Sequence, residues 1–338
     1  MIWQKALLYK KNSIFDAIKN LEETAIQIIL VVDSNNNFVG TLTDGDIRNG
    51  ILKGVKLNSP IEKLMNSKPI IVKKKISEQT AFDIMRKYSI NHLPLIKKKK
   101  VIDLYQVSLK KIHKEHNNFF VIMAGGKGKR LMPLTKNIPK PLLMYKKKHL
   151  IEHILNKIKK SGFSNVFVSV NYLKDKIIKK LKDGSKYGLK IHYLKENQTL
   201  GTVGCLSQLN SKTKNPILLT NCDVITEMNY LELLNFHNKK KSDLTVVIKE
   251  HQSINPFGQI KIKSSKILNI VEKPISLSYI NSGIYVNNSI FFNFLKKKKE
   301  LDMNSFIAKL LTLKKKIVPY PITDKWSDVS DYLKKNNK

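Results

Sequence analysis

The sequence predicts an α/β protein in which a mostly parallel sheet follows a smaller α/β module. From Phe119 onward, short apolar runs alternate with amphipathic helical patterns, as in successive βαβ units. Before residue 115, a pattern of strands and helix occurs twice with a period of about 55–60 residues, which indicates an internal repeat. We therefore expect two domains, residues 1–115 and 118–338.

The first domain is expected to contain two similar units. In the first unit, two β-branched runs flank a polar turn at residues 33–37, which predicts a hairpin followed by a helix. In the second unit, an extended segment and an amphipathic helix precede two strands around a lysine turn. The expected strands are residues 26–32, 38–43, 70–72, 92–96 and 101–105, and the expected helices are residues 46–52 and 78–87. The polar stretch 110–118 reads as a linker.

The second domain is expected to adopt a Rossmann-like fold with a mixed, mostly parallel sheet covered on both faces. Its expected strands are residues 119–123, 166–170, 191–193, 217–220 and 244–248, and its expected helices are residues 150–160, 174–182, 202–209 and 231–238. In such sheets, ligands bind at the carboxyl ends of the strands. We therefore expect functional residues directly after each apolar run.

The chain is strongly basic. Its 338 residues include 62 Lys and Arg and 26 Asp and Glu, which gives a net charge of +36. The lysine runs are scattered and are not interleaved with aromatic residues, as a platform for single-stranded nucleic acid would require. We interpret the charge as solvated surface that draws in anionic substrates, and expect no nucleic-acid partner. Retention on DNA that is sensitive to salt would contradict this expectation.

The cysteines indicate a reducing compartment, and the apolar runs predict no membrane span. Cys205 and Cys222 form no CxxC pair, which excludes a disulfide scaffold and a structural zinc site. The first residues contain no hydrophobic signal core, and the longest apolar run, residues 28–32, is too short to span a bilayer. We therefore expect a cytoplasmic protein with no membrane span.

A glycine-rich segment, MAGGKGKRLMPLTKNIPKP, follows the first strand of the second domain at residues 123–141. Gly125, Gly126 and Gly128 allow backbone N–H groups to approach a phosphate closely. Arg130 and Lys140 add positive charge, and the prolines on both sides of Lys140 restrict its backbone. The spacing matches neither a Walker A loop nor a dinucleotide-binding loop. The segment predicts a site for a triphosphate.

This segment resembles the signature of sugar-1-phosphate nucleotidyltransferases, G-G-x-G-[TS]-R-L-x-P-L-T followed by P-K-P, with Lys129 in place of Thr or Ser. The resemblance covers about residues 119–333, and the remaining motifs occur in family order. They are Glu196 to Thr202 with Gly201, Asn221-Cys-Asp223, Pro256-Phe-Gly258, Glu272-Lys273-Pro274, Asn281-Ser-Gly283-Ile-Tyr285 and Trp326-Ser-Asp328-Val329. The last departs from the family pattern, because the Gly that should follow is replaced or displaced at Ser330.

The resemblance implies a reaction in which a nucleoside triphosphate and a sugar 1-phosphate give a nucleotide sugar and pyrophosphate. It implies catalytic roles for Arg130, Lys140 and Lys273, and Mg²⁺ bound by Asp223 and Asp328. The same resemblance assigns Gly125, Gly126, Gly128 and Gly201 to the nucleotide, and Gly258, Glu272 and Asn281 to the sugar.

The N-terminal repeats resemble a pair of CBS domains, through IILVVDSNNNFVGTLTDGDI at residues 28–47 and SINHLPLI at residues 89–96. In that family, a Thr and an Asp three residues later hold the phosphate and ribose of an adenosyl or guanosyl nucleotide. Thr43 and Asp46 match this pattern, whereas the second repeat lacks it, so we expect at most one nucleotide site. Such pairs often dimerise, which implies a homo-oligomer. The alternative is a module that only packs or dimerises.

A CBS pair ahead of this catalytic domain resembles guanylyltransferases of bacterial surface-sugar and nonulosonic-acid pathways, which implies GTP as the donor. Transferases that use UTP, dTTP or CTP are alternatives. A further alternative is a nucleotide-sensing regulatory protein with an inactive transferase domain. The sequence His149-Leu-Ile-Glu152-His153 also spells a zinc-peptidase pattern, but no further acidic ligand follows at a suitable position, and we do not favour zinc hydrolysis.

Overall fold

The computed structural model of the protein describes residues 2–24, 26–88, 90–106, 116–196, 200–209, 213–289, 295, 300–329 and 332–333. The chain divides into two compact units, Met1–His113 and Lys114–Lys338, and each is described by itself. Most of the linker expected at residues 110–118 lies outside the described residues.

The N-terminal unit contains the expected repeat. In the first half, β1 (Leu7–Tyr9) runs parallel to β2 (Ile28–Val32), which pairs antiparallel with β3 (Phe38–Thr43). In the second half, Val72 forms a parallel bridge to β4 (His92–Lys97), which pairs antiparallel with β5 (Lys100–Gln106). The helices are α1 (Ile14–Thr24), α2 (Asp44–Leu52) and α3 (Glu78–Lys87). Helix α1 is an addition to the predicted elements, and its Ile14 and Ala17 are fully buried.

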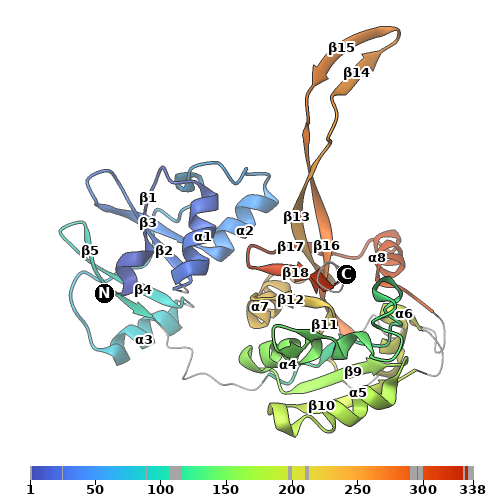
Figure 1. The fold of residues 1–338 in the computed structure, drawn as a ribbon. Coiled ribbons are helices and arrows are strands. Elements are labelled where there is room, and N and C mark those ends of the chain that lie inside the picture. The colour runs from blue at the N-terminus through green and yellow to red at the C-terminus, as the bar shows by residue number, and fades with distance from the viewer. Residues whose placement is uncertain are drawn as a thin grey trace. The chain divides into compact units, whose positions relative to one another are not determined.

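The C-terminal unit is built on a seven-stranded sheet in the order β10-β9-β6-β11-β16-β13-β17 (Figure 1). The strands β10, β9, β6 and β11 run parallel, β13 and β17 are parallel to each other, and β16 is antiparallel to both of its neighbours. The sheet is therefore mixed and mostly parallel, as predicted. The bounds are β6 Phe120–Met123, β9 Asn165–Val170, β10 Lys190–Lys195, β11 Ile217–Asn221, β13 Leu244–Ile254, β16 Ile275–Asn287 and β17 Ile317–Pro321.

Apolar side chains on both faces of this sheet are buried beneath helices. On one face, α4 (Leu150–Lys160), α5 (Lys174–Leu181) and α7 (Tyr230–Lys240) cover a core that includes Phe120 and Ile122 of β6. On the other face, α6 (Gly201–Gly204) and α8 (Met303–Thr312) cover Val121. Because both faces of β6 are buried, its sequence is a continuous apolar run rather than an alternation of apolar and polar residues.

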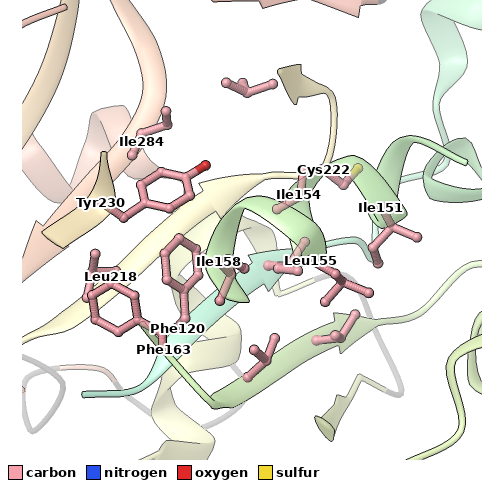
Figure 2. Packing of buried hydrophobic residues seen from close by; sticks show 14 of the residues in the cluster. Phe120, Ile151, Ile154, Leu155, Ile158, Phe163, Leu218, Cys222, Tyr230 and Ile284 are labelled. Carbon is pink, nitrogen blue, oxygen red and sulfur yellow. The ribbon is translucent and has the colours of Figure 1, made fainter. Parts of the chain in front are cut away.

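Aromatic rings fill the first of these cores. The rings of Phe120 and Tyr230 lie 4.8 Å apart at their centroids, and the ring of Phe163 lies 5.8 Å from that of Phe120. Figure 2 shows these rings beside Ile158 of α4. This packing fixes β6 and α4, and therefore the start of the glycine-rich segment that leaves β6.

Two strands of the sheet continue into a long hairpin. Beyond Val247, β13 and β16 remain paired to Ile254 and Ile275, and the hairpin closes through β14 (Gln259–Lys263) and β15 (Lys266–Val271). We call residues 249–280 the arm (Figure 1). The sequence predicts a strand only to residue 248, so the arm is a finding of the structure. Shorter pairs are β7 (Met144–Tyr145) with β8 (Lys148–His149) and β12 (Val224–Thr226) with β18 (Trp326–Asp328).

The N-terminal unit should lose stability in mild acid because of His92. Burial lowers the pKa of this histidine to about 4, and a hydrogen bond with the backbone of Ile26 only partly offsets the effect. The unfolded chain binds a proton with the ordinary His pKa near 6.5. Stability is therefore complete above pH 6.5 and decreases as the pH falls towards 4, by up to about 3 kcal/mol.

We expect the loss between pH 7 and pH 5 to be smaller in His92→Gln than in the wild type. Urea unfolding followed by Trp3 fluorescence in a Trp326→Phe background measures it. An equal pH dependence in both proteins would show that His92 is not the group responsible.

Candidate active site

The candidate site lies where the strand order reverses. The chain passes from β6 to β9 and β10 on one side of the sheet, and β11 then pairs with the other side of β6. The glycine-rich segment leaves the carboxyl end of β6, and Asp223 follows the carboxyl end of β11. Adjacent parallel strands with diverging connections leave a crevice at their carboxyl ends, which is the usual ligand site in such sheets.

Gly128 and Thr135 set the shape of the glycine-rich segment. Gly128 has a φ of 64°, and a Cβ atom there would lie 2.8 Å from Cγ2 of Thr135. The fully buried Thr135 donates its hydroxyl to the Gly128 carbonyl oxygen at 3.0 Å. Thr135 therefore acts as an internal clamp on the turn that carries the short helix Lys129–Leu131.

The other two glycines differ in their surroundings. A Cβ atom at Gly125 would lie 3.1 Å from Oε1 of Glu196, whereas at Gly126 it would meet nothing within 4 Å. Gly126 is therefore the position of the segment where a ligand can approach the backbone. Lys129 and Arg130 are exposed beside it, so the departure from the family signature at Lys129 changes surface charge and not packing.

The buried carboxylate of Glu196 lies beside Gly125 of the glycine-rich segment. Glu196 follows β10, accepts a hydrogen bond from the Ser169 hydroxyl through Oε1 and one from the Leu200 backbone N–H at 3.1 Å through Oε2. Sequence reasoning marked Glu196 only as the start of a motif and missed this role. Its signal is a carboxylate directly after a parallel strand, where backbone N–H groups of the next loop require an acceptor.

Gly201 permits a close contact between two segments. Its φ is 72°, and a Cβ atom would lie 2.7 Å from the Leu301 carbonyl oxygen. That oxygen accepts from the N–H groups of Val203 and Gly204 at 3.0 and 3.3 Å. The structure thus gives Gly201 a packing role, while its contact with a base stays a prediction. Residues 197–199 of the same motif lie outside the described residues.

Lys140 and Asp223 form an ion pair beyond the carboxyl ends of β6 and β11. Lys140 begins the short helix Lys140–Leu142 between its two prolines, and its Nζ donates to Oδ2 of Asp223. The two side chains are only 17% and 16% exposed. Two motifs 83 residues apart in the chain therefore meet in one partly buried contact.

Asp328 is brought to the same place by a short sheet. Strands β12 and β18 pair antiparallel with Val224 opposite Asp328, and the Val329 N–H donates to the Asp223 carbonyl oxygen at 3.0 Å. The two aspartates are therefore neighbours across this pair of strands. Although Ser330 lies outside the described residues, the pairing holds Asp328 without the family's glycine.

The side chains around Lys140 raise its pKa and so favour its charged form. Burial acts to lower the pKa of Lys140, but the surrounding side chains of Cys222, Asp223 and Asp328 outweigh it and raise that pKa. Burial raises the pKa of the Cys222 thiol to about 12, so it is neutral at pH 7. The negative charge that Lys140 faces is therefore that of the two aspartates.

The two carboxylates fit a magnesium ion that is bound partly by substrate. Magnesium prefers oxygen ligands, and proteins usually hold it through one or two carboxylates together with phosphate oxygens and water. Within the described residues, no group of three or more His, Cys, Asp or Glu side chains could hold a metal. Asp223 and Asp328 therefore offer two of the oxygen ligands that such an ion could use.

Asn281 and Trp326 connect the sheet to this carboxylate pair. The Asn281 side chain accepts from the Gly283 N–H at 3.1 Å, and a Cβ atom at Gly283 would lie 2.6 Å from Nδ2 of Asn221. The Trp326 indole N–H donates to the Ser282 carbonyl oxygen at 3.0 Å. Asn281 therefore lies near the crevice, at the base of the arm.

The structure does not bring Gly258, Glu272 and Lys273 to the crevice. They lie together on the arm, where a Cβ atom at Gly258 would be 3.0 Å from Oε2 of Glu272. The β13–β16 pairing runs from Asn281 to Ile275 without a break. Six residues of strand correspond to about 20 Å, and Lys273 lies beyond them. The sugar-binding roles of Gly258 and Glu272 and the catalytic role of Lys273 stay predictions.

Thr43 and Asp46 form a capping box at the start of α2. The Thr43 hydroxyl donates to Oδ2 of Asp46 at 2.6 Å, and the Thr43 N–H donates to the same oxygen at 2.9 Å. In turn, the Asp46 N–H donates to the Thr43 hydroxyl oxygen at 3.4 Å. The pair thus has a local structural role in the N-terminal unit. Its role in binding a nucleotide stays a prediction.

The side chains of the zinc-peptidase pattern, His149, Glu152 and His153, make hydrogen bonds within the fold. His149 Nδ1 lies 2.7 Å from the Leu142 carbonyl oxygen, and His153 Nε2 lies 2.8 Å from that of Tyr145. Glu152 accepts from the His149 N–H and from the Tyr187 hydroxyl, both at 3.0 Å. These contacts anchor α4 to the segment that carries Lys140.

Searches of known families identify both units. A model described as nucleotidyl transferase matches residues 120–337, well over half of the chain, and the chain belongs to this family. A model described as CBS domain matches twice, at residues 7–53 and 61–104. Both resemblances drawn from the motifs are confirmed. None of the helices described in the structure is long and apolar enough to cross a membrane.

Two curated relatives with similar sequences are named for the same activity. "Mannose-1-phosphate guanyltransferase" of Yarrowia lipolytica is 35% identical over 176 residues, which cover 50% of this chain and 48% of that protein. "Mannose-1-phosphate guanylyltransferase catalytic subunit beta" of Xenopus tropicalis is 32% identical over 174 residues, with coverage of 49% and 48%. The chain therefore spans about half the length of the curated relatives it matches.

Solved structures support the fold. HddC from Yersinia pseudotuberculosis has a TM-score of 0.51 and 24% identity, covering 65% of this chain and 100% of that chain. The same protein complexed with GMP-PN has a TM-score of 0.51 and 22% identity over the same coverage. The likeness extends to the architecture of the sheet and its helices.

The glycine positions give a direct test of the segment's geometry. Gly128→Ala should lower the free energy of unfolding by about 1–2 kcal/mol, because its Cβ collides with Thr135 and its φ is left-handed. Gly126→Ala should change it by less than about 0.5 kcal/mol, since its Cβ meets open space. Urea unfolding measures both, and equal losses would contradict the structure of this turn.

Proposed function

We propose that the chain transfers a nucleotidyl group, GMP from GTP, to a sugar 1-phosphate, giving a nucleotide sugar and pyrophosphate. The observation that carries the proposal is the contact of Lys140 with Asp223, beside Asp328, at the point where the strand order reverses. The names of the relatives support GTP as the donor and mannose 1-phosphate, or a similar sugar phosphate, as the acceptor.

The proposed reaction needs no general base. A sugar-phosphate oxygen, already an anion, attacks the α-phosphorus in line, the bond to the β-phosphate oxygen breaks, and pyrophosphate leaves with the electron pair. The barrier lies in bringing two polyanions together and in stabilising the charge that develops. The chain supplies positive charge and backbone donors for this purpose.

Each part of the crevice has a proposed role. The backbone around Gly126 and the side chain of Arg130 hold the β- and γ-phosphates that depart as pyrophosphate. Lys140 leaves its contact with Asp223 and turns to the α-phosphate. Glu196 and Thr135 are positioning residues that keep the glycine-rich segment in shape. Asn281 orients the sugar, and the motif match extends the proposal to the arm, with Gly258 and Glu272 at the sugar and Lys273 at its phosphate, although the structure holds these three residues away from the crevice.

Asp223 and Asp328 would hold Mg²⁺ with the nucleotide, and the ion would supply charge neutralisation at the α-phosphate. We also propose that the reaction takes place in the cytoplasm and serves bacterial surface-glycan or nonulosonic-acid biosynthesis. The two buried free cysteines are consistent with a reducing compartment.

For the CBS pair, we propose one adenosyl or guanosyl nucleotide at Thr43 and Asp46. The capping box holds the Asp46 carboxylate at a defined position at the start of α2, where a ribose hydroxyl could bond to it. Equilibrium dialysis with radiolabelled nucleotides tests this site. Binding by the wild type that is lost in Asp46→Ala supports it, and equal binding in both proteins contradicts it.

The experiment that tests the proposed function is pyrophosphate release from GTP, UTP, dTTP, CTP and ATP, each with a panel of sugar 1-phosphates and Mg²⁺. We expect release only with both substrates present and fastest with GTP. A preference for another base would correct the donor. No release with any pair would favour the alternative, a nucleotide-sensing protein with an inactive transferase domain.

Lys140→Ala should lower kcat by about 10²–10³-fold, because it removes a cation that faces the charge developing in the transition state. Lys136→Ala is the matched control, since Lys136 lies on the same segment and is exposed. Steady-state pyrophosphate release measures both variants. Turnover of Lys140→Ala close to that of the control would exclude the proposed role.

Asp223→Asn should abolish turnover that depends on Mg²⁺, because it removes one of two carboxylates available to the ion. Asp175→Asn, an exposed position at the start of α5, should retain wild-type turnover. Titration of activity with MgCl₂ measures the effect. Recovery of full activity in Asp223→Asn at any Mg²⁺ concentration would argue against a ligand role.

A further inference from the structure

One stretch of the glycine-rich segment is not held by core packing. Thr135 and Pro139 are buried, whereas residues 136–138 between them are exposed. Packing therefore restrains the segment on either side of this stretch but not along it. Lys140, which contacts Asp223, follows the stretch by two residues. The position of Lys140 thus depends in part on what restrains residues 136–138.

Two side chains from the connection between β9 and α5 provide this restraint. The Tyr172 hydroxyl donates to the Lys136 carbonyl oxygen at 2.7 Å, and Nζ of Lys176 donates to the Asn137 carbonyl oxygen at 2.6 Å. They therefore hold two successive carbonyl groups of the exposed stretch. Tyr172 is half-buried and has few rotatable bonds, whereas Lys176 is exposed and long. The contact of Tyr172 is thus the stronger restraint.

The backbone of Tyr172 is bonded to the start of the same segment. Its N–H donates to the Gly125 carbonyl oxygen at 3.4 Å. A Cβ atom at Gly125 would lie 3.3 Å from Cβ of Asn171. Because β9 pairs in parallel with β6, residues 171–172 leave the sheet beside the segment that leaves β6. Tyr172 therefore bonds to the segment twice, near its start at Gly125 and near its end at Lys136.

The turn that presents Tyr172 has a defined shape. Leu173 has a φ of 49°, a left-handed conformation that residues other than glycine rarely adopt. Such a conformation persists only where the surrounding structure imposes it. The Lys176 N–H donates to the Leu173 carbonyl oxygen at 3.1 Å, and this bond joins the turn to α5. The restraint on the glycine-rich segment is therefore anchored to a helix of the core and not to a free loop.

We infer that Tyr172 is a positioning residue for Lys140 and acts by fixing the carbonyl group of Lys136, four residues before the lysine. This role rests on the proposed function, in which Lys140 turns from Asp223 to the α-phosphate. The Tyr172 hydroxyl keeps the backbone in place while the lysine side chain moves. Tyr172 itself does not touch the reacting atoms.

Tyr172→Phe tests the role because it removes only the hydroxyl. We expect kcat for pyrophosphate release to decrease by about 3–10-fold, the effect of one lost hydrogen bond, with the KM for the sugar 1-phosphate unchanged. Tyr193→Phe is the matched control, since its hydroxyl donates to the Lys182 carbonyl oxygen at 2.5 Å, outside the crevice. A kcat of Tyr172→Phe equal to that of the control would overturn the role.

A double-mutant cycle distinguishes positioning from damage to the fold. In a Lys140→Ala background, Tyr172→Phe should lower kcat no further, because the residue through which it acts is already gone. A loss of folded protein would instead lower turnover by the same factor in both backgrounds. Equal losses in both backgrounds would therefore contradict action through Lys140.

Hydrogen exchange measured by mass spectrometry separates this role from the proposed function, because it needs no substrate. The N–H groups of Leu142 and Leu143 donate to the carbonyl oxygens of Pro139 and Lys140 at 2.8 and 3.1 Å. In Tyr172→Phe, residues 134–143 should exchange about 3–10-fold faster, while α7 exchanges as in the wild type.

Unchanged exchange in residues 134–143 would contradict the restraint even if the wild type is active. Faster exchange in a chain that transfers no nucleotide would contradict the proposed function and leave the restraint standing. Tyr193→Phe should exchange like the wild type in residues 134–143, and faster exchange there would show that the effect is not specific to Tyr172.

Discussion

The site depends on one constraint, the meeting of a lysine and two carboxylates at the carboxyl ends of β6 and β11. Lys140 comes from the segment that leaves β6, Asp223 ends the turn after β11, and Asp328 is held by the pairing of β18 with β12. Burying any one of these charged groups alone would cost free energy, and the attraction between the lysine and the carboxylates offsets part of that cost. Under the proposed function, a nucleotide with its metal would take the place of Lys140 at the carboxylates, and Lys140 would contact the nucleotide instead.

The remaining parts of the crevice keep this cluster in place. Thr135 clamps the turn at Gly128, and Glu196 binds the loop that leads to Gly201. His149 and His153 tie α4 to the segment around Lys140. Catalysis by charge is most effective when the backbone segments that carry the charges are fixed before substrate arrives, because reorganisation of these segments would consume the gain. Buried hydrogen bonds to backbone groups provide this fixation without occupying the catalytic side chains.

Much of the fold could be predicted from the sequence because local and global signals agree in the parallel sheet. The predicted strand at residues 217–220 and helix at residues 150–160 are observed with nearly the same bounds. The order of motifs also predicted roles for Lys140, Asp223 and Asp328, but their meeting depends on pairing between distant segments that no local pattern shows. The arm was missed for the same reason, since its strands gain their length by pairing with each other. Glu196 and Thr135 stand in the predicted motifs, but their supporting roles were missed because a buried polar side chain gives no periodic signal.

The most direct test of this account is the binding of Mn²⁺, a spectroscopic substitute for Mg²⁺, followed by electron paramagnetic resonance in the presence of GTP. The account predicts that the wild type holds the Mn²⁺–GTP complex and gives the spectrum of an immobilised ion. It predicts that Asp223→Asn and Asp328→Asn lose this signal at the same concentrations and that Asp175→Asn retains it. An Asp223→Asn protein that binds Mn²⁺–GTP as the wild type does would contradict the central role of the carboxylate pair.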